Sequence, residues 1–232
     1  MREILVMVAV GGLMAITGAA SADTVNVWSA GPGLGIAIPD DLYDGSFVGM
    51  ASDFIVVGDD GFGGNIITDI DVTIGMSHTW IGDLVIKLVS PGGTVLTLLS
   101  RPGFAELADD GTGCCGDSSN LAFAFPITYD DASLNSAELM GGGIGGTLVV
   151  GDPANGSPDN YFPNPGAGPG VALSDFNGLN ALGNWTLYIG DSVSADTGVL
   201  DRWSMTITTI PAPGALALLG MAGLVSRRRR RS

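Results

Sequence analysis

The residues needed for acyl-transfer chemistry are scarce in this 232-residue chain, which contains one histidine, His78, and two cysteines. A Ser-His-Asp triad needs a histidine as its general base. Serine follows Gly-Asp twice, at Ser118 and Ser192, but neither triplet lies in a G-x-S-x-G nucleophile turn. Asp83, five residues after His78, is the expected hydrogen-bond partner of the imidazole. The sequence therefore predicts no catalytic residues, and it predicts a structural role for the histidine.

Aspartates near the predicted strand ends are the second group that could do chemistry. Loop carboxylates and backbone carbonyls are hard oxygen ligands that suit Ca²⁺. The same aspartates could instead form Asx turns and hydrate the surface, and no EF-hand or nonapeptide calcium repeat decides between these alternatives. The candidate ligands are Asp40, Asp41, Asp130, Asp131 and Asp191. Calcium is accordingly the one cofactor that the sequence suggests.

Cys114 and Cys115 are adjacent in the chain. Across a trans peptide their Cα atoms lie about 3.8 Å apart, which is below the usual range for a disulfide. A strained vicinal disulfide, two free thiols and a bridge to another chain remain open, and export would favour oxidation. A metal site would need further ligands, and none is spaced for it. We expect the pair to be a structural feature of a loop.

Alternating apolar and polar residues predict a strand on each side of His78. Residues 69–76 and 84–90 each place alternate side chains on one face. Lys87 is expected to point to water. Ser90–Gly93 is a predicted turn, with glycine taking a positive φ at its third position, and 94–100 return antiparallel, which makes a hairpin at the centre of the domain. The predicted core-facing residues are Ile70, Val72, Ile74, Met76, Leu84, Ile86 and Leu88.

Further short strands complete an all-β pattern with 37 glycines and many turn signals. No long helix is predicted between the two ends of the chain. A loop over 101–120 holds the cysteines, and a proline-rich loop over Asp152–Val171 is expected to cover a sheet edge or end. The predicted strands are Asp23–Trp28 at an edge, Ile36–Asp40, Phe54–Val57, Leu121–Ile127, Trp185–Ile189 and Trp203–Ile207.

The stretch from His78 to Thr94, H-T-W-I-G-D-L-V-I-K-L-V-S-P-G-G-T, resembles the core motif of the P domain, also called the P/Homo B domain. This module follows the subtilisin-like catalytic domain in proprotein convertases, and no stretch of this chain resembles that catalytic domain. The resemblance covers Leu34 to Thr209 and implies a jelly-roll-like antiparallel β-sandwich over residues 23–209. Its structural motif residues here are His78, Trp80, Asp83, Trp185, Asp191 and Trp203.

The charge of the predicted domain is strongly acidic. Outside the two ends of the chain only Lys87, Arg101 and Arg202 are basic, against 23 acidic residues once Glu3 is set aside, a net charge of −20. Such a surface repels nucleic acid and anionic membranes. It favours solubility or bound cations, and it excludes a nucleic-acid partner.

Residues 1–22 are expected to be a secretory signal peptide. Arg2 supplies a charged start, Ile4–Ile16 is apolar, and Ala20-Ser21-Ala22 is a small-residue cleavage site.

Residues 210–232 resemble a PEP-CTERM sorting signal, which an exosortase in the bacterial membrane recognises. Pro211 and Pro213 precede a predicted hydrophobic helix, with Ala212 at the position where that motif has glutamate. Residues 212–225 would form a helix about 21 Å long, shorter than a comfortable membrane span. Five arginines follow and would hold the C-terminus in the cytoplasm; they are Arg227, Arg228, Arg229, Arg230 and Arg231.

Three functional hypotheses follow. The first is an exported, non-catalytic protein of the bacterial envelope, cell surface or extracellular matrix, transiently anchored in the membrane. The second is a calcium-assisted module that binds polysaccharide or other surface proteins, with exposed aromatics such as Tyr161, Phe162 or Tyr188 as contacts. The third is an accessory P domain of a subtilisin-like protease system.

Overall fold

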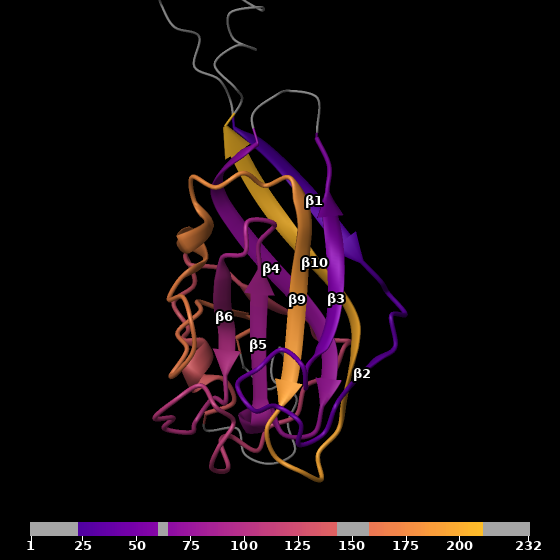
Figure 1. Cartoon of the computed structure of the whole chain (residues 1–232), viewed down its shortest axis with the longest axis vertical. Helices are drawn as coiled ribbons and strands as arrows, with labels where there is room; N and C mark the ends of the chain where they lie inside the picture. The colour runs from indigo at the N-terminus through magenta and orange to yellow at the C-terminus, as the bar shows by residue number, and fades with distance from the viewer. Residues whose placement is uncertain (1–22, 60–64, 143–157, 211–232) are drawn as a thin grey trace, which may run out of the picture.

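The computed structural model describes residues 23–59, 65–142 and 158–210 (Figure 1). Over these residues the secondary structure is β-strand with short 3₁₀ turns, η1 Ile81–Asp83, η2 Ala137–Leu139 and η4 Leu173–Phe176. The strands are β1 Thr24–Ala30, β2 Ile36–Ile38, β3 Ala51–Val57, β4 Ile66–His78, β5 Leu84–Val89, β6 Val95–Ser100, β7 Ile127–Tyr129, β8 Asn160–Tyr161, β9 Gly183–Asp191 and β10 Gly198–Ile210.

Two sheets pack face to face, which confirms the predicted β-sandwich (Figure 1). The first sheet has the order β1-β10-β4-β7-β8, with β2 also paired to β10, and the second has the order β3-β9-β5-β6. All pairs are antiparallel except β7 with β8, which is parallel. The strand predicted over Leu121–Ile127 is wrong over most of its length, because Leu121 makes only an isolated bridge to His78 and strand β7 begins at Ile127, the last residue of the predicted range.

The inner faces of the two sheets form the core, as the alternation predicts. All seven predicted core residues of β4 and β5 are at most 4% exposed. β9 and β10 contribute Trp185 and Trp203 at 0% and 1% exposure, with apolar residues at every second position after them. Each fully buried side chain of this size stabilises the fold by about 1.5–3 kcal/mol, so the core accounts for the pairing of the sheets.

Lys87 departs from the predicted pattern, because its side chain is 3% exposed. Its Nζ donates hydrogen bonds to the Tyr43 hydroxyl at 2.7 Å and to Asp109 at 2.6 Å. Val85, on the same face of β5, is buried with Tyr43 and Met50. The prediction that Lys87 points to water is wrong, because it assumed an open outer face, whereas loops before β3 and after β6 cover this face.

The β5–β6 hairpin lies at one edge of the second sheet rather than at its centre. Gly93 N–H donates to the Ser90 carbonyl at 2.9 Å, and the positive φ, 86°, falls on Gly93, one position later than predicted. The outer edge of β6 is covered as expected, since Thr97 N–H donates to the Pro169 carbonyl at 2.8 Å. Residues 152–157 of the covering loop lie outside the described ranges.

Both ends of the described chain lie at one end of the sandwich. Thr24 pairs with Thr209 in the first sheet, and β1 begins where β10 ends (Figure 1). The predicted signal peptide and sorting tail, 1–22 and 211–232, lie outside the described residues. No helix in the described part is long and apolar enough to cross a membrane.

One polar contact joins the two sheets through the core. Trp203, on β10, donates from Nε1 to the Asp53 carboxylate on β3 at 2.8 Å. The indole is 1% exposed, so its N–H would lack a water partner without Asp53. A buried donor left unsatisfied costs free energy, which favours the observed register between the sheets.

Replacing Trp203 with Phe should lower the free energy of unfolding by about 1–3 kcal/mol, because the aromatic ring stays buried while the cross-sheet hydrogen bond is lost. Urea unfolding of W203F, D53A and the double variant measures this. We expect a coupling energy of about 0.5–3 kcal/mol between the two positions. Strictly additive effects would contradict a direct contribution of the contact.

Candidate functional site

Three of the motif residues, His78, Asp83 and Asp191, lie close together at the end of the sandwich opposite the termini. His78 closes β4 and Asp191 closes β9, and the imidazole Nε2 lies 3.0 Å from the Asp191 carboxylate. The other ring nitrogen, Nδ1, lies 2.8 Å from the Trp80 carbonyl. Both side chains are at most 1% exposed. The contact therefore ties one sheet to the other, and Asp191 takes the place that the sequence analysis gave to Asp83.

Asp83 lies beside this pair without a described contact to the imidazole. Its backbone carbonyl accepts hydrogen bonds from the amide and the hydroxyl of Ser192, both at 3.0 Å. Its Oδ1 is buried and has no hydrogen-bond partner within the described residues. Burial, followed by the charges of Asp191 and Asp196, raises the pKa of the Asp83 carboxyl to about 7. This carboxyl therefore takes up a proton close to neutral pH.

The tryptophans of the motif pack against neighbouring parts of the domain, which indicates a structural role. Trp185 donates from Nε1 to the Ala181 carbonyl at 2.7 Å and packs edge-on against Phe176, with ring centres 5.0 Å apart. Trp80 is half-buried, and its Nε1 has no hydrogen-bond partner in the part that the structure describes. The described hydrogen bonds of the His78 ring go to Trp80 and Asp191. The motif thus shapes the fold, and these contacts contain no nucleophile.

The aspartates proposed as calcium ligands fall at two places. Asp130 and Asp131 follow β7 in the first sheet; Asp130 accepts a hydrogen bond from Ala132 N–H, and Asp131 accepts from the first amides of the η4 region. Asp40 and Asp41 precede the loop whose Leu42 N–H donates to the Asp191 carbonyl. Calcium stays a prediction, and the described ranges contain no group of three or more His, Cys, Asp or Glu side chains placed to hold a metal.

A long loop after β6 is organised by Arg101, which the sequence analysis did not single out. The Arg101 side chain is fully buried, and it donates to the carbonyls of Thr112 at 2.8 Å and Gly113 at 2.5 Å. These acceptors lead directly into Cys114 and Cys115, which the structure joins as a vicinal disulfide. Of the three options for the cysteines, the structure therefore contains the vicinal disulfide, in an exposed loop held by a buried cation.

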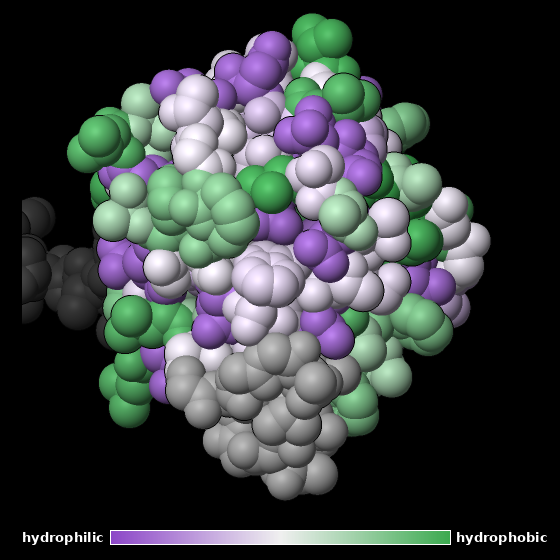
Figure 2. Space-filling model, turned by 90° about the horizontal axis from the view of Figure 1, so that it is seen from below, coloured by the Kyte–Doolittle hydropathy of each residue, from purple (hydrophilic) through white to green (hydrophobic). Residues whose placement is uncertain are grey.

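The aromatics suggested as ligand contacts are not equally available. Tyr161 is 3% exposed and donates to the Pro158 carbonyl at 2.9 Å, so the expectation that it is an exposed contact is wrong. Phe162 and Tyr188 are half-buried, and Tyr188 packs against Phe47 with ring centres 4.3 Å apart. At the end of the molecule seen in Figure 2, hydrophilic and hydrophobic residues are interspersed over the visible surface.

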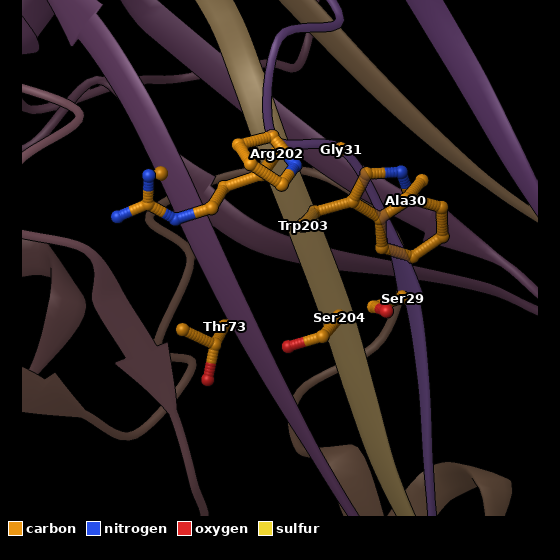
Figure 3. A pocket seen from close by; sticks show the side chains of 9 residues that line it. Ser29, Ala30, Gly31, Thr73, Arg202, Trp203 and Ser204 are labelled. Atoms are coloured by element: carbon orange, nitrogen blue, oxygen red, sulfur yellow. The ribbon is translucent and has the colours of Figure 1, made fainter.

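A pocket of about 250 Å³ opens on the outer face of the first sheet, where β1, β10 and β4 run side by side (Figure 3). Polar side chains and one cation contribute to its lining. The lining residues are Ser29, Ala30, Gly31, Pro32, Thr73, Gly75, Arg202, Trp203 and Ser204. Sequence reasoning missed this pocket, because the residues come from three segments that only the strand register brings together.

Comparison with known proteins supports a P domain. The profile of the proprotein convertase P-domain matches residues 67–113, from β4 through the β5–β6 hairpin into the Arg101 loop. No curated protein matches the sequence. The matched domain is an accessory one, and no catalytic domain is evident in the described part of this chain.

Two solved structures resemble the chain. The serine protease of Aeromonas sobria in complex with its chaperone (ORF2) is 16% identical, with a TM-score of 0.43, over 82% of this chain and 28% of that chain. The serine protease of Aeromonas sobria by itself is 17% identical, with a TM-score of 0.42, over 80% of this chain and 27% of that chain. This chain thus spans less than a third of those proteins.

The stability of the protein should fall as the pH rises from about 4 to about 7. A carboxyl with a raised pKa binds its proton more tightly in the folded state, so its protonated form stabilises the fold below the unfolded pKa, and this is lost as the pH passes the folded value. For Asp83 the window runs from 3.8 to about 7. Asp71, raised to about 6, and Glu138, raised to about 7, act in the same direction.

The variant D83N should flatten this fall, because an amide at position 83 does not titrate. Thermal melts at stepped pH give the profile. D44N is the control, since the Asp44 carboxylate is fully exposed and hydrogen bonds from Ser46 lower its pKa, which moves its effect below pH 4. A D83N profile parallel to that of the unsubstituted protein would show that Asp83 is not the titrating group.

Proposed function

We propose that this chain is an exported, non-catalytic protein of the bacterial envelope, built on one P domain and sorted by an exosortase-type enzyme through its tail. The observation that carries the proposal is the P-domain match at residues 67–113 within a β-sandwich. The sequence adds a signal-peptide pattern before the domain and the proline, apolar and arginine pattern after it. The protein would act at the cell surface or in the extracellular matrix as a structural or adhesive module.

The arrangement of the domain supports a tethered position. Thr24 and Thr209 pair at one end of the sandwich, while His78 and Asp191 mark the other end (Figure 1). A domain held through residues 210–232 would direct the His78 end away from the membrane. The acidic surface is repelled by anionic lipid head groups, which keeps the domain off the membrane.

A polysaccharide-binding role is the second candidate, and the pocket beside Arg202 is the observation that favours it. A role beside a subtilisin-like protease is the third, and it depends on the P-domain resemblance alone.

The envelope assignment is tested with the full chain, expressed in bacteria that contain or lack an exosortase. We expect the protein in the envelope or medium without residues 1–22, and loss of the tail only where the exosortase is present. A variant with Arg227–Arg231 replaced by alanine should keep its tail in both hosts. Cell fractionation and intact mass measure these outcomes. Cytoplasmic protein with an intact N-terminus would contradict the proposal.

Calcium is tested by thermal melts of the exported protein in EDTA and then in millimolar calcium. A cation at 100 times its dissociation constant stabilises the folded state by about 2.7 kcal/mol, which raises the melting temperature by roughly 5–10 °C for a domain of this size. We expect this rise with calcium and not with magnesium. D130N/D131N and D40N/D41N separate the two places where the aspartates lie. Identical melts in EDTA and calcium would remove calcium from the proposal.

A further inference from the structure

We propose that the pocket on the outer face of the first sheet binds one neutral sugar unit of a polysaccharide. The ligand class is defined by three hydroxyls on the pocket floor and by one guanidinium on its wall. The proposal deepens the polysaccharide-binding candidate, and it takes from the proposed function only the location at the cell surface.

The floor of the pocket is a row of hydroxyls set by the strand register. Ser29 of β1 pairs with Ser204 of β10, and Ser204 pairs with Thr73 of β4. Neighbouring strands lie about 4.8 Å apart, so the three hydroxyls are spaced evenly across the sheet (Figure 3). Each hydroxyl both donates and accepts hydrogen bonds. Such a row matches a ring that carries several hydroxyls of its own.

One end of this row is already ordered. Thr73 Oγ1 lies 2.9 Å from the hydroxyl of Thr128 on β7, the next strand of the sheet. This contact fixes the Thr73 rotamer, whereas Ser29 is exposed and Ser204 is half-buried. The floor therefore combines one oriented hydroxyl with two that rotate to suit a ligand.

The cationic wall depends on a glycine in the middle of β4. A Cβ at Gly75 would lie 2.9 Å from Arg202 Cγ and 3.1 Å from its Nε, so a larger residue would displace the Arg202 side chain from its path across the strand (Figure 3). Two described hydrogen bonds hold the guanidinium, one to Asp201 and one to the Phe123 carbonyl. The guanidinium has five N–H donors in all, which leaves others for a ligand.

A second wall, Ala30–Pro32, is also held against the sheet through a glycine. Gly31 has a φ of 88°, and a Cβ there would lie 2.5 Å from the Asp201 carbonyl oxygen. The wall therefore keeps its position only with glycine at 31, because other residues rarely adopt this φ and would collide with β10. Both walls of the pocket thus rest on glycines whose replacement would disturb them.

Charge favours a neutral ligand over an acidic one. Of the three basic residues of the domain, Lys87 and Arg101 are buried, at 3% and 0% exposure, and Arg202 is paired with Asp201. A polyanion approaching this pocket would meet a domain with a net charge of −20 and a single cation that is already paired with its neighbour. A neutral polyol incurs no such repulsion and satisfies both donors and acceptors.

The test is a ¹H–¹⁵N NMR titration of the labelled full chain with glucose, galactose and mannose through the millimolar range. We expect at least one hexose to shift the amide signals of Ser29, Thr73, Gly75, Arg202 and Ser204 saturably. T73V removes the oriented hydroxyl at nearly constant shape and should weaken binding about fivefold, the value of one hydrogen bond. T206V, two residues from Ser204 on the same strand face and outside the pocket, should leave the affinity unchanged.

Three outcomes would overturn the proposal: no saturable shift in these amides with any of the three hexoses, equal affinities for T73V and T206V, or tighter binding of glucuronate than of glucose. The last result would assign the pocket to acidic sugars. Refolded full chain serves for this titration if the protein is not exported. Failure of the localisation experiment and failure of the titration are therefore separate results.

Discussion

The buried contact between His78 and Asp191 is the constraint on which one whole end of the molecule depends. It joins the last residue of β4 in one sheet to the last residue of β9 in the other, 3.0 Å apart and shielded from water. The Asp191 carbonyl also accepts the amides of Leu42 and Tyr43. Tyr43 in turn contacts Lys87 and Asp109. The end of β9 that this contact fixes thus positions the loop before β3 and, through it, the loop after β6.

The sequence was a good guide wherever a strand has one face on the core and the pairing is local. Period-two alternation in β4, β9 and β10 correctly predicted which side chains are buried, because that alternation follows from strand geometry alone. It failed at Lys87, since loops distant in sequence cover the outer face of β5. The predicted hydrogen-bond partner of His78 was also wrong, because the carboxylate that contacts the imidazole belongs to Asp191, 113 positions away, and not to Asp83, five positions away.

The pocket could not be predicted for a related reason. Ser29, Thr73 and Ser204 are unremarkable in the sequence, and their meeting depends on two strand registers. Gly75 gives the one local signal, a glycine inside an otherwise well-formed strand, and such glycines often mark close approach by another group. Here that group is Arg202, whose side chain occupies the space that a Cβ would need.

The polar residues around His78 and those of the pocket on the first sheet differ in burial and charge. At the His78 end, the buried acid Asp83 carries a raised pKa and an unpartnered oxygen, which costs stability near neutral pH. This free-energy cost is associated with the fixed arrangement of the loops around Asp83. These loops lie at the end of the sandwich opposite the paired Thr24 and Thr209 (Figure 1). The hydroxyl row instead lies on a sheet face, where regular strand pairing holds its backbone in register without buried charge. The sheet face therefore keeps its backbone fixed by strand pairing, while the loops at the other end are held by the buried network around His78 and Asp191.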